Sequence, residues 1–330
     1  MYVFHVCYTT LPGLEAHFCS LPMKKGEKIA AITIDMDHET DYARVYDQSP
    51  VSIRSEYLYR ESIPRILALL KRFNIKATFF IVGRDLQIPF RRRKIARILG
   101  EGHELGNHTF SHHHNFHLLS RNEKYVEIAK THDLALKKLH YKMIGFRAPG
   151  YNIDGTTIQI LHRLGYRYDS SIHPTILHPL LRFVLFLKTK KKSSLKSMGP
   201  KNAILASITP YRCSLHDPCK VDTSSNMLEI PISVLPIIRL PYFGTIDLHL
   251  GKLYILLTSP LRNKLSWTNY EIHGIDLIDA PSGDFAWFAK HPGMHRPAKE
   301  RMQLYENIFK KLSMRQTVTL REAALRSLTL

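Results

Sequence analysis

The chain has 330 residues, and its 47 Lys and Arg against 28 Asp and Glu give a formal net charge of +19 at pH 7. A hydrophobic fraction of 44% excludes an intrinsically disordered chain. The charge favours an anionic partner, which nucleic acid, an acidic glycan or an anionic membrane face would each supply.

Residues 1–22 precede the first predicted element and lack the basic region of a signal peptide. We interpret them as an extension, with Met23 as a candidate start, and expect residues 23–330 to form a single domain. The four cysteines are too few and too scattered for a disulfide framework, and reduced thiols favour a cytoplasmic protein. No apolar run is long enough to span a bilayer.

Strands and helices alternate along the first half of the chain. We predict strands at residues 28–34, 77–82, 103–106, 144–147 and 166–169, and helices at residues 62–73, 91–99, 121–139 and 156–164. Alternation of this kind predicts a parallel β/α architecture. The basic run at residues 91–94 could be a solvated helix face or a binding surface.

The alternation stops between about residues 172 and 226, which we interpret as an insertion. The insertion contains an apolar run at residues 178–187 and a basic run at residues 188–192. Regularity returns at residues 227–232, 251–257 and 270–273, followed by a predicted helix at residues 299–312 and a short strand near residues 317–320.

Two carboxylates lie at the end of the first predicted strand. Alternate side chains of a strand share a face, so Asp35 and Asp37 point the same way while Ile34 and Met36 point into packing. Neighbouring carboxylates repel unless a cation, a proton or an arginine compensates them. One of them could bind a metal while the other takes a proton; an ordinary surface loop is the alternative.

Two histidines follow the third predicted strand. His108 and His112 are four residues apart, so one helical turn capped by Asn107 would place both imidazoles on one side. Two imidazoles and one aspartate leave open coordination positions, as catalytic zinc requires, and a second aspartate is then free to act as general base.

Five motifs occur in a fixed order, namely TIDMD at residues 33–37, HTFSH at 108–112, RAPGY at 147–151, YRYDSS at 166–171 and EIHGID at 271–276. With them the chain resembles the polysaccharide deacetylase family, whose NodB-homology domain is similar to carbohydrate esterase family 4. The resemblance implies an α/β fold, an irregular (β/α) barrel, and a hydrolase of carbon–nitrogen bonds other than peptide bonds.

The resemblance also implies a role for each matching residue. Asp37, His108 and His112 would hold a divalent metal, with Zn²⁺ expected. Asp35 would be the general base that takes a proton from the attacking water, and Arg147 would orient it. His273 would be the general acid that protonates the leaving amine, and Asp169 would tune it. Pro149 and Tyr151 would contact the substrate, with a backbone N–H near Tyr151 assisting at the oxyanion.

Two positions depart from the family pattern. Met36 separates the two aspartates, so Asp35 and Asp37 could exchange roles. Gly150 stands where many members have an aromatic residue, so the wall that binds the sugar would differ.

The implied reaction is removal of an N-acyl group, acetyl or formyl, from an amino sugar in a polysaccharide or a lipid-linked glycan. The apolar run and the basic run of the insertion, with a similar run at residues 252–257, lead to the hypothesis of a peripheral enzyme on the inner face of the membrane. Runs that simply cover the barrel are the alternative.

A hydrolase of a small non-sugar amide and a non-catalytic protein that binds an anionic partner also stay open. Nucleic acid is not expected, because few aromatic residues interleave with the basic runs.

Overall fold

The computed structural model describes residues 26–45, 55–178, 199–279 and 283–328. The expected extension at residues 1–22 and the runs at residues 179–192 lie outside the described residues. Strands (β), helices (α) and 3₁₀ helices (η) follow one another in this order: β1 Ile29–Met36, α1 Glu39–Val45, α2 Tyr57–Arg72, β2 Thr78–Ile81, η1 Gly83–Gln87, α3 Pro89–Gly100, β3 Glu104–Asn107, η2 Phe116–Leu118, α4 Arg121–Leu139, β4 Gly145–Phe146, η3 Pro149–Tyr151, α5 Gly155–Arg163, β5 Tyr168–Asp169, η5 Lys201–Leu205, β6 Tyr211–Arg212, β7 Leu228–Glu229, α7 Gly244–Lys264, β8 Trp267–His273, η6 Gly274–Leu277, η7 Gly283–Lys290, α8 Ala298–Leu312, β9 Gln316–Thr317 and α9 Leu320–Leu328.

The strands of the described residues form one curled sheet in the order β6-β7-β5-β4-β3-β2-β1-β8, with β9 paired to β1. Adjacent strands run parallel from β7 along this order to β8, and β6 runs antiparallel to β7. After β7, the N–H of Ser233 donates to the carbonyl of Asn269 (3.1 Å), and the N–H of Asn269 donates to Ser233 Oγ (2.8 Å). These bonds join the chain after β7 to β8 and curl the sheet towards closure. The predicted irregular (β/α) barrel is therefore confirmed.

The two faces of β1 pack into different cores. Ile32 and Ile34 face outward and belong to the main core under the helices. Ile29 and Ala31 face inward and pack with Trp267 in a second core at the amino-terminal end of the barrel. Because side chains alternate along a strand, the inner face then presents polar residues towards the carboxyl end. The interior is thus apolar at one end and polar at the other.

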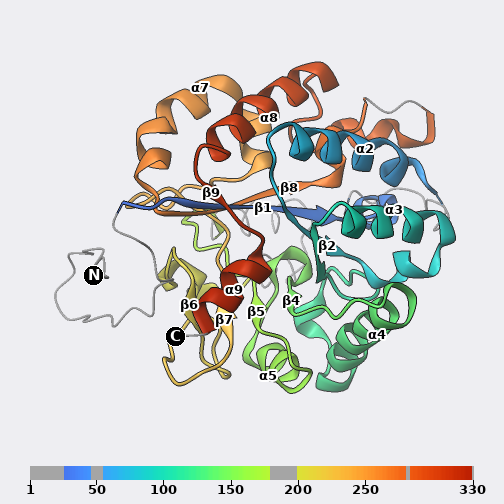
Figure 1. The fold of residues 1–330 in the computed structure, drawn as a ribbon, viewed down its shortest axis with the longest axis vertical. Helices are drawn as coiled ribbons and strands as arrows, with labels where there is room; N and C mark the ends of the chain where they lie inside the picture. Colours follow the sequence, from blue (N-terminus) through green and yellow to red (C-terminus); the bar gives the residue numbers. More distant parts are fainter. Residues whose placement is uncertain (1–25, 46–54, 179–198, 280–282, 329–330) are drawn as a thin grey trace, which may run out of the picture.

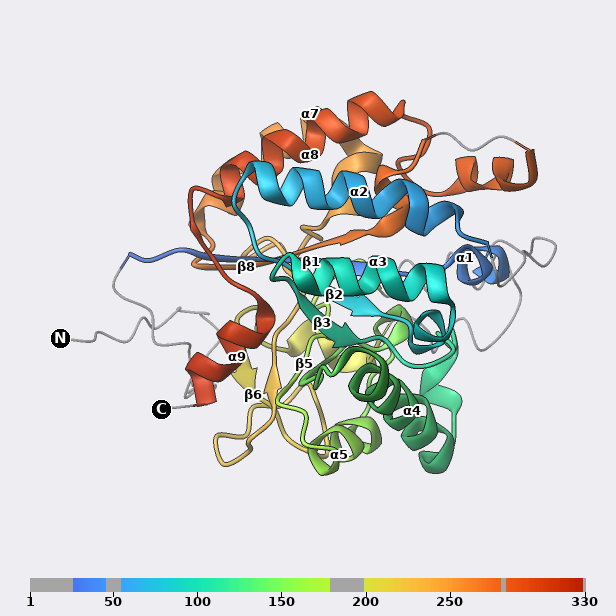
Figure 2. The same cartoon turned by 45° about the vertical axis from the view of Figure 1, so that its right-hand side comes forward.

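Helices pack around the outside of the curled sheet. Figures 1 and 2 show α2, α7 and α8 above β1 and α4 and α5 below it. The last helix, α9, closes the amino-terminal end, where the N–H of Leu320 donates to Thr78 Oγ1 (2.9 Å) and that of Arg321 to Glu104 Oε2 (2.8 Å). The predicted short strand near residues 317–320 ends at Thr317 as β9, and the helix that follows was not predicted. Its sequence signal is the Thr-x-x-Glu pattern at residues 319–322, which forms a reciprocal cap.

Two further expectations need correction or sharpening. Residues 251–257, where the sequence indicated only renewed regularity, lie inside the helix α7. In the basic run at residues 91–94, Arg91 is fully buried and donates to Asp85 Oδ1 at 2.6 Å, so at this position the run is neither a solvated face nor a binding surface. A buried carboxylate on a neighbouring turn offsets this buried charge.

Candidate active site

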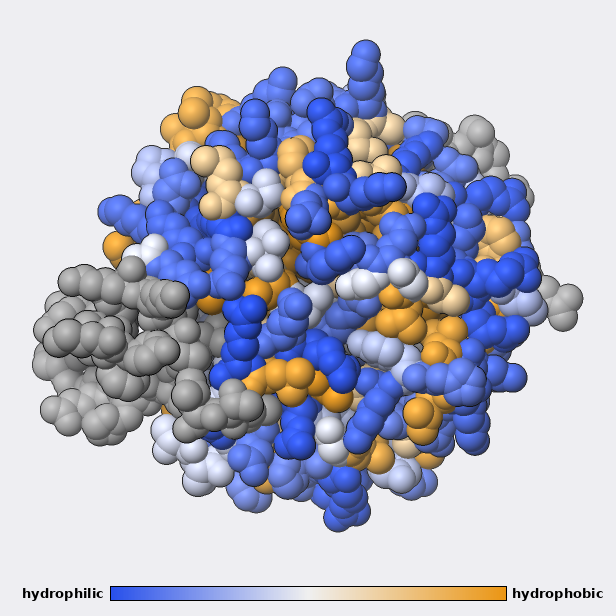
Figure 3. Space-filling view, in the orientation of Figure 1, coloured by the Kyte–Doolittle hydropathy of each residue, from blue (hydrophilic) through white to orange (hydrophobic). Residues whose placement is uncertain are grey.

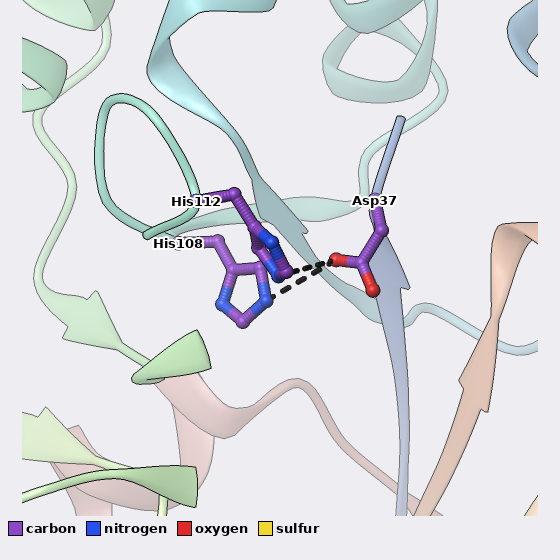
Figure 4. Close-up of side chains that lie close together, drawn as sticks. All are labelled: Asp37, His108 and His112. Atoms are coloured by element: carbon purple, nitrogen blue, oxygen red, sulfur yellow. Dashed lines mark ion pairs between the residues drawn. The ribbon is translucent and has the colours of Figure 1, made fainter. Parts of the chain in front are cut away.

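Three side chains that are far apart in the sequence meet at the carboxyl ends of β1 and β3. Asp37 Oδ1 lies 3.3 Å from His108 Nε2 and 3.1 Å from His112 Nε2. Figure 4 shows the two imidazoles turned towards the carboxylate at the end of β1. All three side chains are buried, and their potential ligand atoms lie within 4.8 Å of one another. The structure therefore brings together the residues that were expected to hold a metal.

The loop that presents the two histidines is not the expected helical turn. Thr109 and His112 have φ angles of +64° and +51°, in the left-handed region. Asn107 Oδ1 accepts a hydrogen bond from the N–H of Thr109 (2.8 Å), and Thr109 Oγ1 accepts one from the N–H of His112 (3.2 Å). The predicted spacing was useful, but a tight loop rather than a helix places both rings on one side.

The other nitrogen of each imidazole has its own oxygen partner. His108 Nδ1 lies 2.8 Å from the carbonyl oxygen of Arg147, and His112 Nδ1 lies 3.6 Å from Asp41 Oδ1. Asp41 in turn accepts a hydrogen bond from the buried guanidinium of Arg84. The carbonyl acceptor at Nδ1 fixes the ring of His108 and leaves the lone pair on Nε2, which is the arrangement seen around metal-ligating histidines. Asp41 contacts His112 as a charged neighbour, beyond hydrogen-bond distance. Sequence reasoning missed Asp41.

The electrostatics of the cluster fit a bound cation. Asp37 Oδ1 is buried, and the polar groups that it faces among the described residues are the two imidazoles. Burial would raise the pKa of Asp37, but His112 and then His108 hold it well below its ordinary value. Burial lowers the pKa of His112, yet Asp37 and Asp41 outweigh it and raise the pKa to about 9. A buried site that attracts positive charge, built from one carboxylate and two imidazoles, suits a divalent metal such as zinc.

The second aspartate of the motif faces a different partner. Arg147 Nη1 donates to Asp35 Oδ1 at 2.7 Å, while Asp35 Oδ2 lies 3.8 Å from His108 Nε2. Burial raises the pKa of Asp35, but Arg147 and His108 outweigh it and lower the pKa. Asp37 contacts both imidazoles, whereas Asp35 is paired with the arginine. The geometry thus favours Asp37 as the ligand and Asp35 as the free carboxylate.

Glu271 is a site residue that sequence reasoning missed. It pairs in register with Thr33 of β1, two residues before His273, and is fully buried. Its carboxylate lies 3.5 Å from Arg147 Nη1 and accepts a hydrogen bond from Tyr151 Oη (3.1 Å). Burial and the nearby Asp35 raise the pKa of Glu271 to about 8. The period of two along β8, counted back from His273, would have placed Glu271 on the same inner face.

The carboxylates of Asp35 and Glu271 could also hold a cation together with His273, since their potential ligand atoms lie within 4.8 Å of one another. The guanidinium of Arg147 already contacts both carboxylates. Its positive charge disfavours a second metal at this position, so we assign the two carboxylates to the arginine.

His273 lies at the end of β8, and its side chain remains 16% exposed while Glu271 beside it is fully buried. Its Nε2 lies 3.9 Å from Glu271 Oε1, and its Nδ1 lies 3.4 Å from Thr245 Oγ1. Burial lowers the pKa of His273, but Glu271 and Asp35 outweigh it and raise the pKa. His291 in the loop before α8 is a poorer acid, because burial lowers its pKa to about 4.

Asp169 does not take the place expected for it. Its carboxylate accepts hydrogen bonds from the hydroxyl of Ser171 (2.6 Å) and from the N–H of the same residue (3.3 Å). Burial raises its pKa, and burial also raises the pKa of the neighbouring Glu229 well above its ordinary value. Among the described residues, the carboxylate paired with the imidazole of His273 is that of Glu271, on the same strand, and not that of Asp169.

The third motif forms the short helix η3 after β4. The N–H of Tyr151 itself donates to the carbonyl of Ala148 (3.1 Å) within this turn. An oxyanion contact from a backbone N–H near Tyr151 stays a prediction. Pro149 is buried at the start of η3, and Gly150 has a φ of +60°. The side chain of Tyr151, in contrast, reaches the site through its hydroxyl.

Part of the chain is similar to a known family. Residues 23–168 match the family model described as polysaccharide deacetylase. A peptidoglycan deacetylase of Helicobacter pylori is 28% identical over 149 residues, which cover 44% of this chain and 50% of that protein. A peptidoglycan-N-acetylglucosamine deacetylase of Bacillus cereus is 37% identical over 90 residues, or 27% of this chain and 31% of that protein.

The chain thus spans half or less of the length of these two relatives. Among solved structures, a protein from Mycobacterium smegmatis, named provisionally as a polysaccharide deacetylase, covers 97% of this chain and 94% of its own length, with a TM-score of 0.57 and 15% identity. This likeness shows the fold.

The family match divides the site into two parts. Asp37, His108, His112 and Arg147 lie inside the matched residues of the polysaccharide deacetylase domain. Glu271 and His273 lie beyond them, on β8. The two parts come together because β8 pairs with β1, with Asp35 in register with His273.

Proposed function

We propose that this protein is a metal-dependent hydrolase that removes an N-acyl group from an amino sugar of a glycan. The observation that carries the proposal is the cluster of Asp37, His108 and His112 beside a separate, arginine-paired Asp35. The match to the polysaccharide deacetylase family model and relatives named as peptidoglycan deacetylases support it. A binding protein would have no need for metal ligands, a base and an acid in one place.

The side chains divide the reaction between them. A divalent cation held by Asp37, His108 and His112 would lower the pKa of water to about 7 and polarise the acyl oxygen. Asp35 Oδ1 is held by Arg147, so Oδ2 is the atom that takes the proton as water adds to the acyl carbon.

His273 acts on the other side of the acyl group. Its raised pKa favours the protonated form, and Nε2 gives its proton to the nitrogen as the carbon–nitrogen bond breaks. The products are the free amine and the carboxylic acid.

The test combines metal content with acyl release. Purified protein is assayed for bound metal and for acetate and formate released from N-acylated glucosamine oligomers. We expect one divalent metal, activity in the wild type, loss of metal in His108→Ala, and loss of activity with metal retained in Asp35→Asn. The exposed residues His162 and Asp133 provide matched controls, His162→Ala and Asp133→Asn, which should behave as the wild type.

Other outcomes would contradict the proposal. Metal bound equally by wild type and His108→Ala would contradict the assigned ligands. Release of acyl groups from small amides but from no glycan would favour the hydrolase of small amides instead.

We further propose that the glycan is lipid-linked and that the enzyme works at an anionic membrane surface on the cytoplasmic side. No helix of the described residues is long and apolar enough to cross a membrane. The helix α7 nevertheless exposes Leu253, Leu256 and Leu257, by 66%, 69% and 69% of their surface, and Figure 3 shows apolar side chains gathered over this helix at the upper left. Exposed apolar side chains on a strongly basic protein favour an anionic interface.

A flotation assay tests the membrane proposal. We expect the protein to float with vesicles that contain anionic lipid and to stay behind with neutral vesicles. The variant Leu253→Gln/Leu256→Gln/Leu257→Gln should lose flotation while keeping acyl release from soluble oligomers. Flotation that is unchanged in this variant, or absent in the wild type, would contradict the idea.

A further inference from the structure

An aromatic cluster lies on the acid side of the site. The ring of His173 lies 5.6 Å from that of Tyr151, 5.1 Å from that of His178 and 5.2 Å from that of Phe243, each in an edge-to-face arrangement. Tyr151 and His178 stack with 22° between their planes. The rings come from the loop after β4, the loop after β5 and the residue before α7. Three loops at the carboxyl ends of the strands thus converge on one imidazole.

The imidazole of His173 has no polar partner in the part of the chain that the structure describes. The residue is 3% exposed, and neither Nδ1 nor Nε2 makes a hydrogen bond. Burial, His178 and Arg147 lower its pKa well below the ordinary value, so the ring is neutral. A neutral imidazole offers one donor and one acceptor, and buried polar groups are almost always paired. A partner that offers both an acceptor and a donor would satisfy the ring.

The cluster borders the reacting groups rather than the metal ligands. Tyr151, whose ring contacts His173, donates its hydroxyl to Glu271, and Glu271 lies beside the acid His273. Phe243 stands two residues before Thr245, which contacts His273 from the other side. A group bound against His173 would therefore lie next to the leaving nitrogen.

We propose that His173, flanked by Tyr151 and Phe243, is a substrate-binding residue that holds a hydroxyl group of the amino sugar whose acyl group is removed. The inference rests on the proposed function and adds a subsite to it. A sugar hydroxyl is both donor and acceptor, which matches a neutral imidazole, and aromatic rings pack against the apolar face of a pyranose. A neutral ring carries no charge of its own with which to attract an ionic group.

Binding is measured separately from catalysis. Calorimetry follows the N-acetylglucosamine tetramer as it binds to the metal-loaded Asp35→Asn protein, which cannot turn it over. We expect His173→Phe in this background to weaken binding about tenfold, the effect of one or two neutral hydrogen bonds. Phe keeps the ring and removes two unsatisfied nitrogens, so the melting temperature should be equal or higher. His173→Asn, which keeps a donor and an acceptor, should bind with intermediate affinity.

The control is His162→Phe, the same chemical change on an exposed face of α5, which should leave binding unchanged. Equal affinity in the parent and in His173→Phe, or no binding by the parent, would overturn the subsite; an internal water would then be the partner of the ring. If binding depends on His173 but the wild type releases no acyl group from any oligomer, the subsite stands and the proposed hydrolysis fails.

Discussion

Replacement of Arg147 by Met should destabilise the protein strongly, because it removes the cation that two buried carboxylates share. The guanidinium is fully buried and donates to Asp35 Oδ1 (2.7 Å), to the carbonyl of Ser170 (2.8 Å) and to Ser170 Oγ (2.9 Å). It also lies 3.5 Å from Glu271 Oε1. Met retains an apolar stem of similar length, so the main loss is electrostatic.

The expected loss is about 3–5 kcal/mol of unfolding free energy at pH 7, the cost of leaving a buried charge without its partner. Glu271, with a pKa of about 8, is neutral at this pH, so the uncompensated charge is that of Asp35. The folded protein holds the pKa of Asp35 below its ordinary value of 3.8, so this pair stabilises the fold above that pH and less as the pH falls. The deficit of the variant should therefore shrink below about pH 4.

Urea-induced unfolding followed by far-ultraviolet circular dichroism measures the effect. The double variant Arg147→Met/Asp35→Asn removes both charges and should recover at least half of the lost stability. A loss below about 1 kcal/mol in the single variant, or a double variant no more stable than the single one, would refute the argument that Arg147 compensates Asp35.

Three other predictions concern Asp41, His112 and His103. Asp41→Asn should weaken zinc binding about 10- to 100-fold, because it removes the negative charge beside His112 Nδ1. Competition with a chromophoric chelator measures the affinity, and unchanged affinity would contradict that role. Zinc binding at pH 7.5 should release about one proton, because the pKa of His112 is about 9 without metal. Calorimetry in two buffers of different ionisation enthalpy measures the number of protons released. No release would count against His112 as a ligand. The chelator-treated protein should lose stability as the pH falls from 6.5 to 4, because burial lowers the pKa of His103 to about 4 and the unfolded chain therefore takes up this proton at a higher pH. In urea titrations, His103→Gln should reduce the dependence of the unfolding free energy on pH. An unchanged dependence would exclude this histidine as the cause.

Local pattern in the sequence was enough for a large part of the site. The period of two placed Asp35 and Asp37 on one face of β1, and the inward-facing Ile29 and Ala31 below them confirm that face. The alternation of strands and helices predicted the parallel barrel. Both inferences depend only on neighbours in the chain, for which side-chain direction follows from backbone geometry.

Other parts of the site depend on contacts that no local pattern encodes. The partner of His273 is Glu271 rather than Asp169, because curling of the sheet turns the inner face of β8 towards β1. The histidine loop has left-handed residues whose conformation depends on hydrogen bonds made within the folded turn. Asp41 contacts His112 because α1 packs beside that loop in the folded protein.

The sequence by itself determined which residue types would face the interior of the barrel and in which order along each strand. The tertiary structure decided which aspartate faces the imidazoles and which is paired with Arg147. The reason is physical, because the direction of a side chain is set by the residue's own backbone, whereas ion pairs depend on closure of the sheet. Closure brings β1 next to a strand more than 200 residues away, as the hydrogen bond from Thr33 to Asn269 across 236 positions shows.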